Sequence, residues 1–366
     1  MGEWYDMKKI IFYLCLLFII FNGSNQCIFA ASNSGKCGEN VNWYYNLETK
    51  ELLIQGKGAT YNYSTNHEAG EYTLDEWNSF EPDVDDYKFH NGAVKPRPWH
   101  DCDIKKIVIK EGITEIKACT FHGMDNLEEV ELPSTLKIIG NSAFGATGLK
   151  RINIPDSVLG IKGMAFLGCS NLKTVRIGKN VEKIGESAFD SSGLTKLVLY
   201  DKIQQIDNEA FSGCTNLTEV DLKRCVKLIR IEPSVFNYCV KLKSIVLPKS
   251  IKDISESAFA DCEALNNVNL NELELENIKR SAFEKCISLK NIVINKKVTK
   301  IGERAFYGCK KLKKIVIKTS KLKKIGANAF EGINSKAKFK VPKKKIKPYK
   351  KLIKKAKAPK KCKITK

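Results

Sequence analysis

The chain contains the stretch Val181-Glu-Lys-Ile-Gly-Glu-Ser-Ala-Phe189, and variants of this phrase occur ten times. An isoleucine stands five positions before each repeated phenylalanine, and an aliphatic residue stands eight positions before it. The phenylalanines recur every 22 to 25 residues, at Phe121, Phe144, Phe166, Phe189, Phe211, Phe236, Phe259, Phe283, Phe306 and Phe330. A fixed period in the low twenties predicts a solenoid, because each unit buries its apolar face against its neighbours.

A second apolar phrase, L-x-x-V-x-I, follows each phenylalanine and is represented by Leu172, Val175 and Ile177. Its last three positions alternate between apolar and polar, which predicts a short strand in every unit. Stacking then aligns these strands into one parallel sheet. We expect the Ala-Phe segment to form a brief helical or 3-10 turn with its ring pointing inward. With strands about 4.8 Å apart, ten coils make a rod on the order of 50 Å long.

Six units carry a cysteine three residues after the phenylalanine: Cys169, Cys214, Cys239, Cys262, Cys286 and Cys309. Two other units carry glycine instead, at Gly148 and Gly193, and are one residue shorter there. A small apolar side chain suits a tight corner, so we expect buried free thiols. Disulfide pairing between successive coils is the alternative, because stacking brings them within reach. Outside this ladder, Cys37 and Cys102 bracket the front region, and a disulfide between them is a further expectation.

Residues 1–31 have the pattern of a signal peptide. Lys8 and Lys9 precede the apolar run Ile10–Phe21, which is too short to cross a membrane. Acidic residues before this run indicate Met7 as a possible true start. No later stretch is long and apolar enough for a transmembrane segment. The sequence therefore predicts a secreted or cell-surface protein.

The remaining chain divides into three regions. Residues 32–103 lack the repeat, and the alternation of Val41, Trp43 and Tyr45 predicts a hairpin that turns near Glu48. This region is placed to form a β-rich N-terminal cap over the first coil. Residues 104–333 hold about ten repeat units of 22–25 residues. Residues 334–366 form a lysine-rich C-terminal cap.

Charge is unevenly distributed along a chain whose net charge is +21. Residues 32–103 contain 13 acidic and 6 basic side chains, whereas residues 334–366 contain 16 lysines and no acid. Within this tail, Ile346, Tyr349 and Ile353 have the spacing of one apolar helical stripe, which we expect to cover the last coil. Lys361–Thr365 is a candidate closing strand.

The unit Cys169–Phe189 resembles the repeat of the BspA-like leucine-rich repeat proteins, which are surface or secreted proteins. The opening Cys37-Gly38-Glu39-Asn40-Val41 and the lysine-rich tail are similar to the ends of such proteins. The resemblance implies a right-handed leucine-rich-repeat superhelix with a parallel sheet on one face. It also implies adhesion or protein binding without catalysis. The family has no fixed binding residues, so none is carried over.

Motifs for chemistry are scarce. All four histidines lie in the first third of the chain, and only His100-Asp101-Cys102 and the pair Cys119 and His122 offer fragments of a metal site. A zinc site needs three or four converging ligands. The chain has no phosphate-binding loop, H-E-x-x-H helix or G-x-S-x-G turn. We therefore expect no catalytic residue, no metal and no cofactor.

The first candidate function is protein binding through the outward residues of the strands, on the concave face. The partner expected there is a host extracellular-matrix or cell-surface protein. Val246, Val293 and Val316 are apolar where water is expected, which can mark a protein contact; the alternative is that valine simply suits strands. The candidate residues are Lys196, Val198, Glu219, Asp221, Ser244, Val246, Asn267, Asn269, Asn291, Val293, Lys314 and Val316.

The second candidate function is binding of a polyanion by the tail. An anionic cell-wall polymer or a glycosaminoglycan would be held by a salt-sensitive contact. Nucleic acid is disfavoured, because the protein is predicted to be exported and its tail lacks aromatic residues for base stacking. The alternative is that the lysines only form the polar side of the cap. The residues concerned are Lys343, Lys344, Lys345, Lys347, Lys350, Lys351, Lys354 and Lys355.

Overall fold

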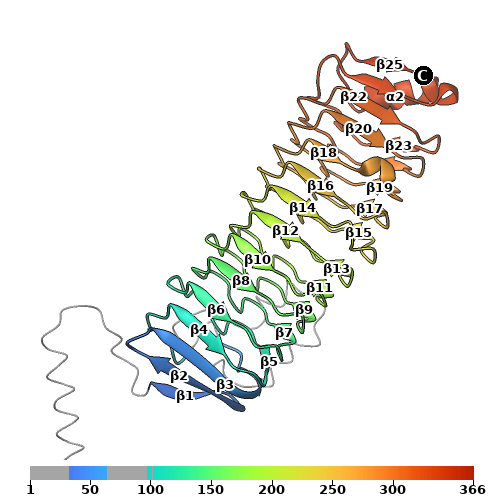
Figure 1. The fold of residues 1–366 in the computed structure, drawn as a ribbon. Coiled ribbons are helices and arrows are strands. Elements are labelled where there is room, and N and C mark those ends of the chain that lie inside the picture. Colours follow the sequence, from blue (N-terminus) through green and yellow to red (C-terminus); the bar gives the residue numbers. More distant parts are fainter. Residues whose placement is uncertain (1–32, 64–96, 101) are drawn as a thin grey trace, which may run out of the picture.

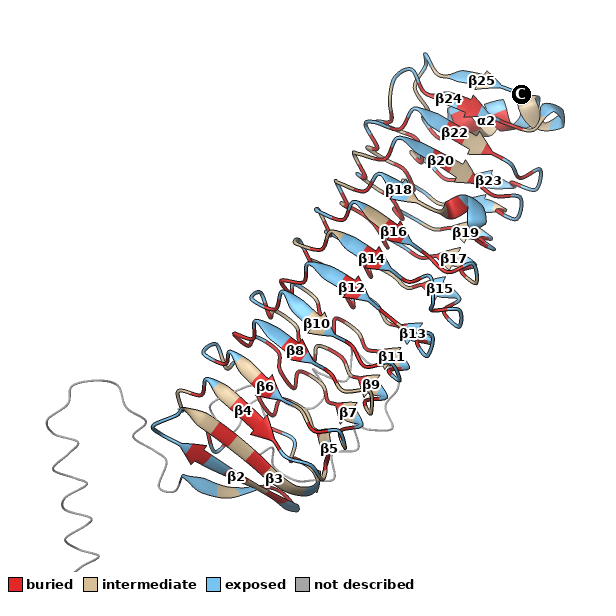
Figure 2. Ribbon diagram, in the orientation of Figure 1, coloured by how far each residue is buried: buried red, intermediate tan, exposed pale blue. Residues whose placement is uncertain are grey.

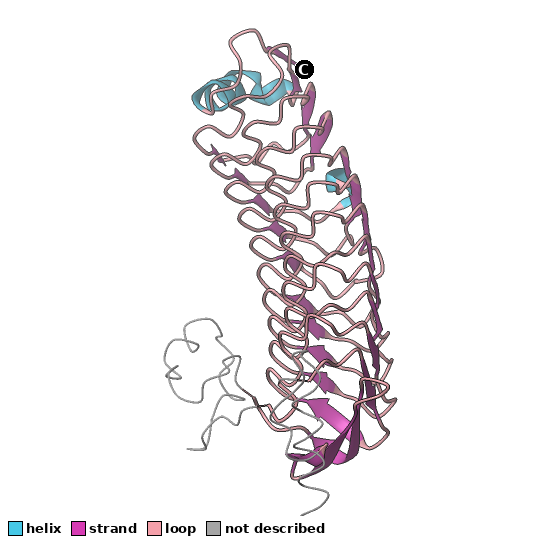
Figure 3. Ribbon diagram, turned by 90° about the vertical axis from the view of Figure 1, so that its left-hand side faces the viewer, coloured by secondary structure: helices cyan, strands magenta, loops and turns pink. Residues whose placement is uncertain are grey.

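A computed structural model describes residues 33–63, 97–100 and 102–366. The predicted signal peptide, residues 1–31, lies outside the described residues. The repeats form a parallel β-solenoid, as predicted, and Figure 1 shows the coils stacked into a long rod with the C-terminal cap at one end. Two rows of strands run along this rod, joined by turns (Figure 3).

The first row contains the predicted L-x-x-V-x-I strands, and its outward surface is here called the strand face. Its strands are β4 (Lys106–Ile109), β6 (Glu129–Glu131), β8 (Arg151–Asn153), β10 (Thr174–Arg176), β12 (Lys196–Val198), β14 (Glu219–Asp221), β16 (Ser244–Val246), β18 (Asn267–Val268), β20 (Asn291–Ile294), β22 (Lys314–Ile317), β24 (Lys338–Lys340) and β25 (Lys363–Thr365). Their pairing is parallel throughout, and successive coils align without a register shift, as in Leu197 beside Val220.

The first row is interrupted, which corrects the expectation of one continuous sheet. Hydrogen-bonded pairing is lost between β6 and β8, between β10 and β12, and between β18 and β20. The first two breaks fall at the shortened coils that carry Gly148 and Gly193. The third lies where the 3-10 helix η2 (Leu270–Glu272) follows β18. Coil length alone does not set the breaks, because the longer step from Glu219 to Ser244 keeps its pairing.

A second row of strands was not predicted. Most strands of this row consist of two residues, namely the repeated isoleucine and the residue before it. Neighbouring strands of the row pair in parallel. The strands are β5 (Ile113–Ile116), β7 (Ile138–Ile139), β9 (Gly160–Ile161), β11 (Lys183–Ile184), β13 (Gln205–Ile206), β15 (Arg230–Ile231), β17 (Asp253–Ile254), β19 (Asn277–Ile278), β21 (Lys300–Ile301) and β23 (Lys324–Ile325).

The ten phenylalanine rings form a single buried column. Neighbouring ring centroids lie 5.0–5.8 Å apart, and the planes of neighbouring rings are inclined by 1–27°. Trp99 stacks on Phe121 at one end, and Phe339 meets Phe330 edge-on at the other. Because every ring is fully buried, the column forms the spine of the core.

The corner that carries each phenylalanine is a turn, not the helical or 3-10 turn that we expected. The residues two before and two after every ring have positive φ, as at Ser187 (50°) and Ser191 (56°). The backbone N–H groups of Ser187, Phe189 and Ser191 each donate to a carbonyl of the following coil, over 2.8–3.0 Å. This left-handed geometry points alternate N–H groups along the rod, so the corners form a third hydrogen-bonded ladder.

The N-terminal cap contains the predicted hairpin. Strands β1 (Ser34–Gly38), β2 (Asn40–Asn46) and β3 (Glu51–Ala59) are antiparallel, and β3 pairs in parallel with both β4 and β5. It therefore covers both strand rows at once. At the phenylalanine corner, the N–H of Tyr63 donates to Ala118 O over 3.0 Å, and Arg97 Nη1 donates to His122 O.

The C-terminal cap follows the prediction. After the 3-10 helix η3 (Lys343–Lys345), helix α2 (Ile346–Lys355) buries Tyr349 and Ile353 against the last coil. Strand β25 pairs in parallel with β24 and closes the strand face. The carbonyl of Ala356, just after α2, accepts the N–H of Phe330 over 3.1 Å.

Candidate binding surfaces

The strand face presents two outward residues per strand, on either side of one inward residue. Lys196 and Val198 flank the buried Leu197, and the same pattern recurs along the row (Figure 2). The register places Val198 beside Asp221, and Asp221 beside Val246. The predicted residues from β12 to β16 therefore lie together on one surface.

Early coils of the strand face are electrically neutralised. Lys106 Nζ lies 2.5 Å from Glu131 Oε1, and Arg176 Nη2 lies 2.7 Å from Asp156 Oδ1. In the middle of the face, Lys196 Nζ lies 3.4 Å from Glu219 Oε2. Exposed pairs of this kind contribute little to stability, so their main effect is on the surface potential.

Valines on the strand face are less exposed than expected in the late coils. Val293 and Val316 are half-buried, whereas Val198 is 55% exposed and Val246 is 38% exposed. Of the three valines predicted to form an apolar patch, only Val246 is exposed, and Val293 and Val316 are partly covered. The exposed valines lie in the middle coils instead, with the carboxylate of Asp221 between them.

Asn269 has a structural role that the sequence did not reveal. Its side-chain amide accepts from the N–H of Leu247 and donates to the carbonyl of Leu247, each over 2.9 Å. These bonds replace the ladder contacts that β18 lacks after Val268. Because the amide is satisfied by the neighbouring coil, Asn269 is not available as an open contact. Among the other predicted residues, Asn267, Asn291 and Lys314 are exposed.

The tail lysines lie on the solvent side of the C-terminal cap. Tyr349 and Ile353 face the last coil, and the Tyr349 hydroxyl donates to Thr319 O over 3.1 Å. Of the eight lysines predicted to bind a polyanion, Lys345 is half-buried, and the exposed ones are Lys343, Lys344, Lys347, Lys350, Lys351, Lys354 and Lys355. The helix thus gathers positive charge at one end of the rod.

A groove of about 900 Å³ lies on the second strand row, at its C-terminal end, and sequence reasoning missed it. Its walls include β19, β21, β23 and α2. Six basic and two acidic residues line it: Lys279, Arg280, Lys300, Lys323, Lys324, Lys355, Glu256 and Glu303. The available sequence signal was the pair Gly302 and Gly326, which recur at the same place in successive units.

The six corner cysteines are buried free thiols, as expected. In one of them, Cys214 Sγ donates to the carbonyl of Phe189 over 3.2 Å, and burial raises the pKa of this thiol to about 12.

The predicted disulfide between Cys37 and Cys102 does not form. Cys37 lies fully buried in the N-terminal cap as a thiol, whereas Cys102 is only half-buried at the start of the first coil.

Within the described residues, no group of three or more His, Cys, Asp or Glu side chains is arranged to hold a metal ion. His67 and His90 lie outside that part of the chain. None of the helices in the described ranges has the length and apolar character needed to cross a membrane.

Residues 94–226 and 229–355 match the family described as BspA type leucine rich repeat region, with six copies. A leucine-rich repeat protein from Bacteroides ovatus is 22% identical, with a TM-score of 0.50, over 89% of this chain and 98% of that chain. A leucine rich cell surface protein from Faecalibacterium prausnitzii is 23% identical, with a TM-score of 0.38, over 83% and 95%. The pneumococcal vaccine antigen PcpA is 19% identical, with a TM-score of 0.44, over 90% and 99%. No curated protein sequence matches the chain.

Proposed function

Because the chain belongs to the BspA-type leucine-rich repeat family, we propose that it is a secreted or cell-surface protein that binds another protein through the strand face. Such a protein works by shape and surface, without catalysis and without a cofactor. The location rests on residues 1–31, whose pattern is that of a signal peptide. The partner expected is a host extracellular-matrix or cell-surface protein, which would make the chain an adhesin.

The observation that carries this proposal is the pair of exposed valines in the middle of the strand face. Val198 and Val246 are 55% and 38% exposed, and they flank Asp221 in register. Aliphatic side chains that leave water on binding contribute about 25 cal/mol for each Å² buried. The carboxylate of Asp221 between them would orient the bound protein, because it favours a basic group on that partner.

The experiment replaces Val198 and Val246 with serine in the full chain and measures binding to immobilised collagen, laminin and intact host cells. The matched control is Val226→Ser, because Val226 is also exposed but lies in the turn after β14. The double variant should lose at least about fivefold in affinity, because two apolar contacts of this size are worth roughly 1–3 kcal/mol. Equal binding by the double variant and the control would refute the proposal.

A second candidate function is favoured by the charge of the C-terminal cap. The tail from residue 334 onward has 16 lysines and no acid, and most of those on η3 and α2 are exposed. These lysines would bind an anionic cell-wall polymer or a glycosaminoglycan through a contact that weakens with salt. Elution of the protein from cell walls by salt, and its loss on replacing Lys344, Lys347 and Lys351 with glutamine, would support this function. Retention at high salt would oppose it.

A further inference from the structure

Two glycines line the groove on the second strand row. Gly302 and Gly326 follow β21 and β23, where Lys279 stands after β19. A Cβ at Gly302 would lie 2.4 Å from the carbonyl carbon of Lys279, and one at Gly326 would lie 2.3 Å from the nitrogen of Glu303. Close stacking of the backbone therefore requires glycine at both positions.

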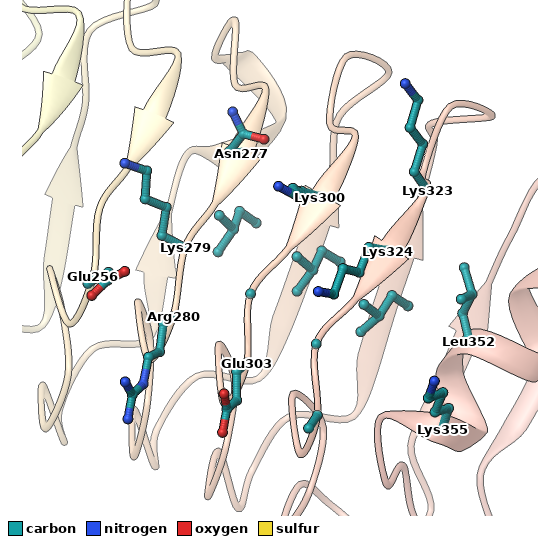
Figure 4. A pocket seen from close by; sticks show the side chains of 16 residues that line it. Glu256, Asn277, Lys279, Arg280, Lys300, Glu303, Lys323, Lys324, Leu352 and Lys355 are labelled. Carbon is teal, nitrogen blue, oxygen red and sulfur yellow. The ribbon is translucent and has the colours of Figure 1, made fainter.

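Basic side chains surround this groove. Figure 4 shows Lys279, Lys300 and Lys324 on three successive coils, with Lys355 of α2 beyond them. The register pairs Lys300 with Lys324, so their backbones lie about 4.8 Å apart. Like charges placed directly opposite each other in a sheet are destabilising unless another group compensates them.

No ion pair within the described residues compensates the six basic groups of the groove. The same row is neutralised in earlier coils, where Lys183 Nζ lies 3.4 Å from Asp207 and Arg230 Nε lies 3.7 Å from Asp253. The acids that pair with bases upstream thus have no counterparts beside Lys300 and Lys324. The groove is therefore a concave surface with an excess of positive charge, six basic side chains against two acidic ones.

From this arrangement we propose that the groove binds a linear anionic polysaccharide, one that carries sulfate or carboxylate groups on its sugars. Lysines at successive coils match repeated charges along a chain that runs parallel to the rod axis. Arg280 adds a fork that fits a sulfate or carboxylate with two hydrogen bonds. Ala327 and Leu352 supply apolar wall for the C–H face of a sugar ring. The inference rests on the second candidate function for its ligand class, but it assigns the site to different residues.

The test measures binding of the full chain to a heparin decasaccharide, to polygalacturonate and to inorganic polyphosphate by calorimetry at low and moderate salt. The groove variant replaces Lys279, Lys300 and Lys324 with glutamine. Its matched control replaces Lys290, Lys313 and Lys338, which removes equal charge at the entry to the first-row strands of the same coils. A tail variant replaces Lys344, Lys347 and Lys351. Circular dichroism should show that all three remain folded, because the replaced side chains lie at the surface.

The groove variant should bind heparin or polygalacturonate about tenfold more weakly than the unaltered chain, because three ion pairs are lost. The control should stay within about twofold. Heparin binding alone would identify sulfate as the recognised group, and polygalacturonate binding would identify carboxylate; either supports the proposal. Equal losses of affinity in the groove variant and the control would overturn the proposal. A loss of affinity in the tail variant alone would also overturn it, and would support the second candidate function instead. Polyphosphate bound as tightly as the sugars, or no binding of any probe, would also overturn it.

Discussion

The rings of Phe283 and Phe306 lie parallel, with their centroids 5.4 Å apart and their planes inclined by only 1°. The two residues belong to successive coils, so their contact joins one repeat to the next. Each ring is fully buried, and each has a second stacked neighbour on its other side. Removal of one ring therefore leaves a void that two coils share.

Phe283→Ala should lower the free energy of unfolding by about 3–5 kcal/mol, through lost burial and an internal cavity. Chemical denaturation followed by circular dichroism measures this change. Tyr238→Ala is the control, because Tyr238 is 52% exposed and should cost less than about 1 kcal/mol. A loss below 1 kcal/mol for Phe283→Ala would show that the column does not support the fold.

Gly302→Ala should destabilise the protein by about 1–3 kcal/mol, because the added methyl group meets the backbone of the preceding coil. Gly160 begins β9 in the same strand row, but a Cβ there has no neighbour within 4 Å. Gly160→Ala should therefore change stability little or increase it slightly. Thermal denaturation of both variants compares them directly, and equal melting temperatures would contradict the tight stacking at Gly302.

Stability should fall as the pH rises above 9. The thiol of Cys214 ionises near 9.0 when exposed, whereas burial raises its pKa to about 12 in the folded chain. Between these values the unfolded state has lost a proton that the folded state keeps, so alkaline pH favours unfolding. The slope for this thiol is about 1.4 kcal/mol for each pH unit.

Urea denaturation from pH 8 to pH 11 measures this dependence, and Cys214→Ala serves as the comparison. The variant should lose stability less steeply than the unaltered chain over the same range, because one buried thiol has been removed. Parallel curves would mean that Cys214 does not hold its proton through burial.

Tyr349→Phe should weaken the C-terminal cap. The Tyr349 hydroxyl donates to Thr319 O and accepts from the N–H of Leu322, each over 3.1 Å, and the group is buried. Loss of both bonds leaves two backbone groups without a partner, at a cost of about 1–3 kcal/mol. Hydrogen exchange should then quicken at the amide of Phe330, which bonds to Ala356 O. Unchanged exchange at Phe330 would show that the cap docks without this tyrosine.

The period in the sequence predicted what depends on spacing alone. Ten phenylalanines at regular intervals predicted the column, and the stripe of Ile346, Tyr349 and Ile353 predicted the capping helix. Both follow from apolar periodicity, which a single chain displays directly. The family and the solenoid fold could be predicted from the sequence for the same reason.

Features that depend on contacts between coils could not be predicted. The second-row strands mostly have two residues, which is too short for an alternating pattern. The turns use left-handed residues such as Glu209 and Arg304, where glycine would have been the recognisable signal. Asn269 bonds a residue 22 positions away, and the basic groove gathers side chains from four elements. Neither arrangement has a local signature.

The corner ladder gives the rod a direction. Alternate N–H groups at every phenylalanine turn point to the following coil, so one bare end would expose donors and the other would expose acceptors. Such ends are mutually complementary, and uncapped copies would add to one another head to tail without limit. Arg97 and Tyr63 supply donors at the first end, and Ala356 supplies an acceptor at the last. The caps thereby block end-to-end association, and copies of the chain without its caps would assemble into a fibre.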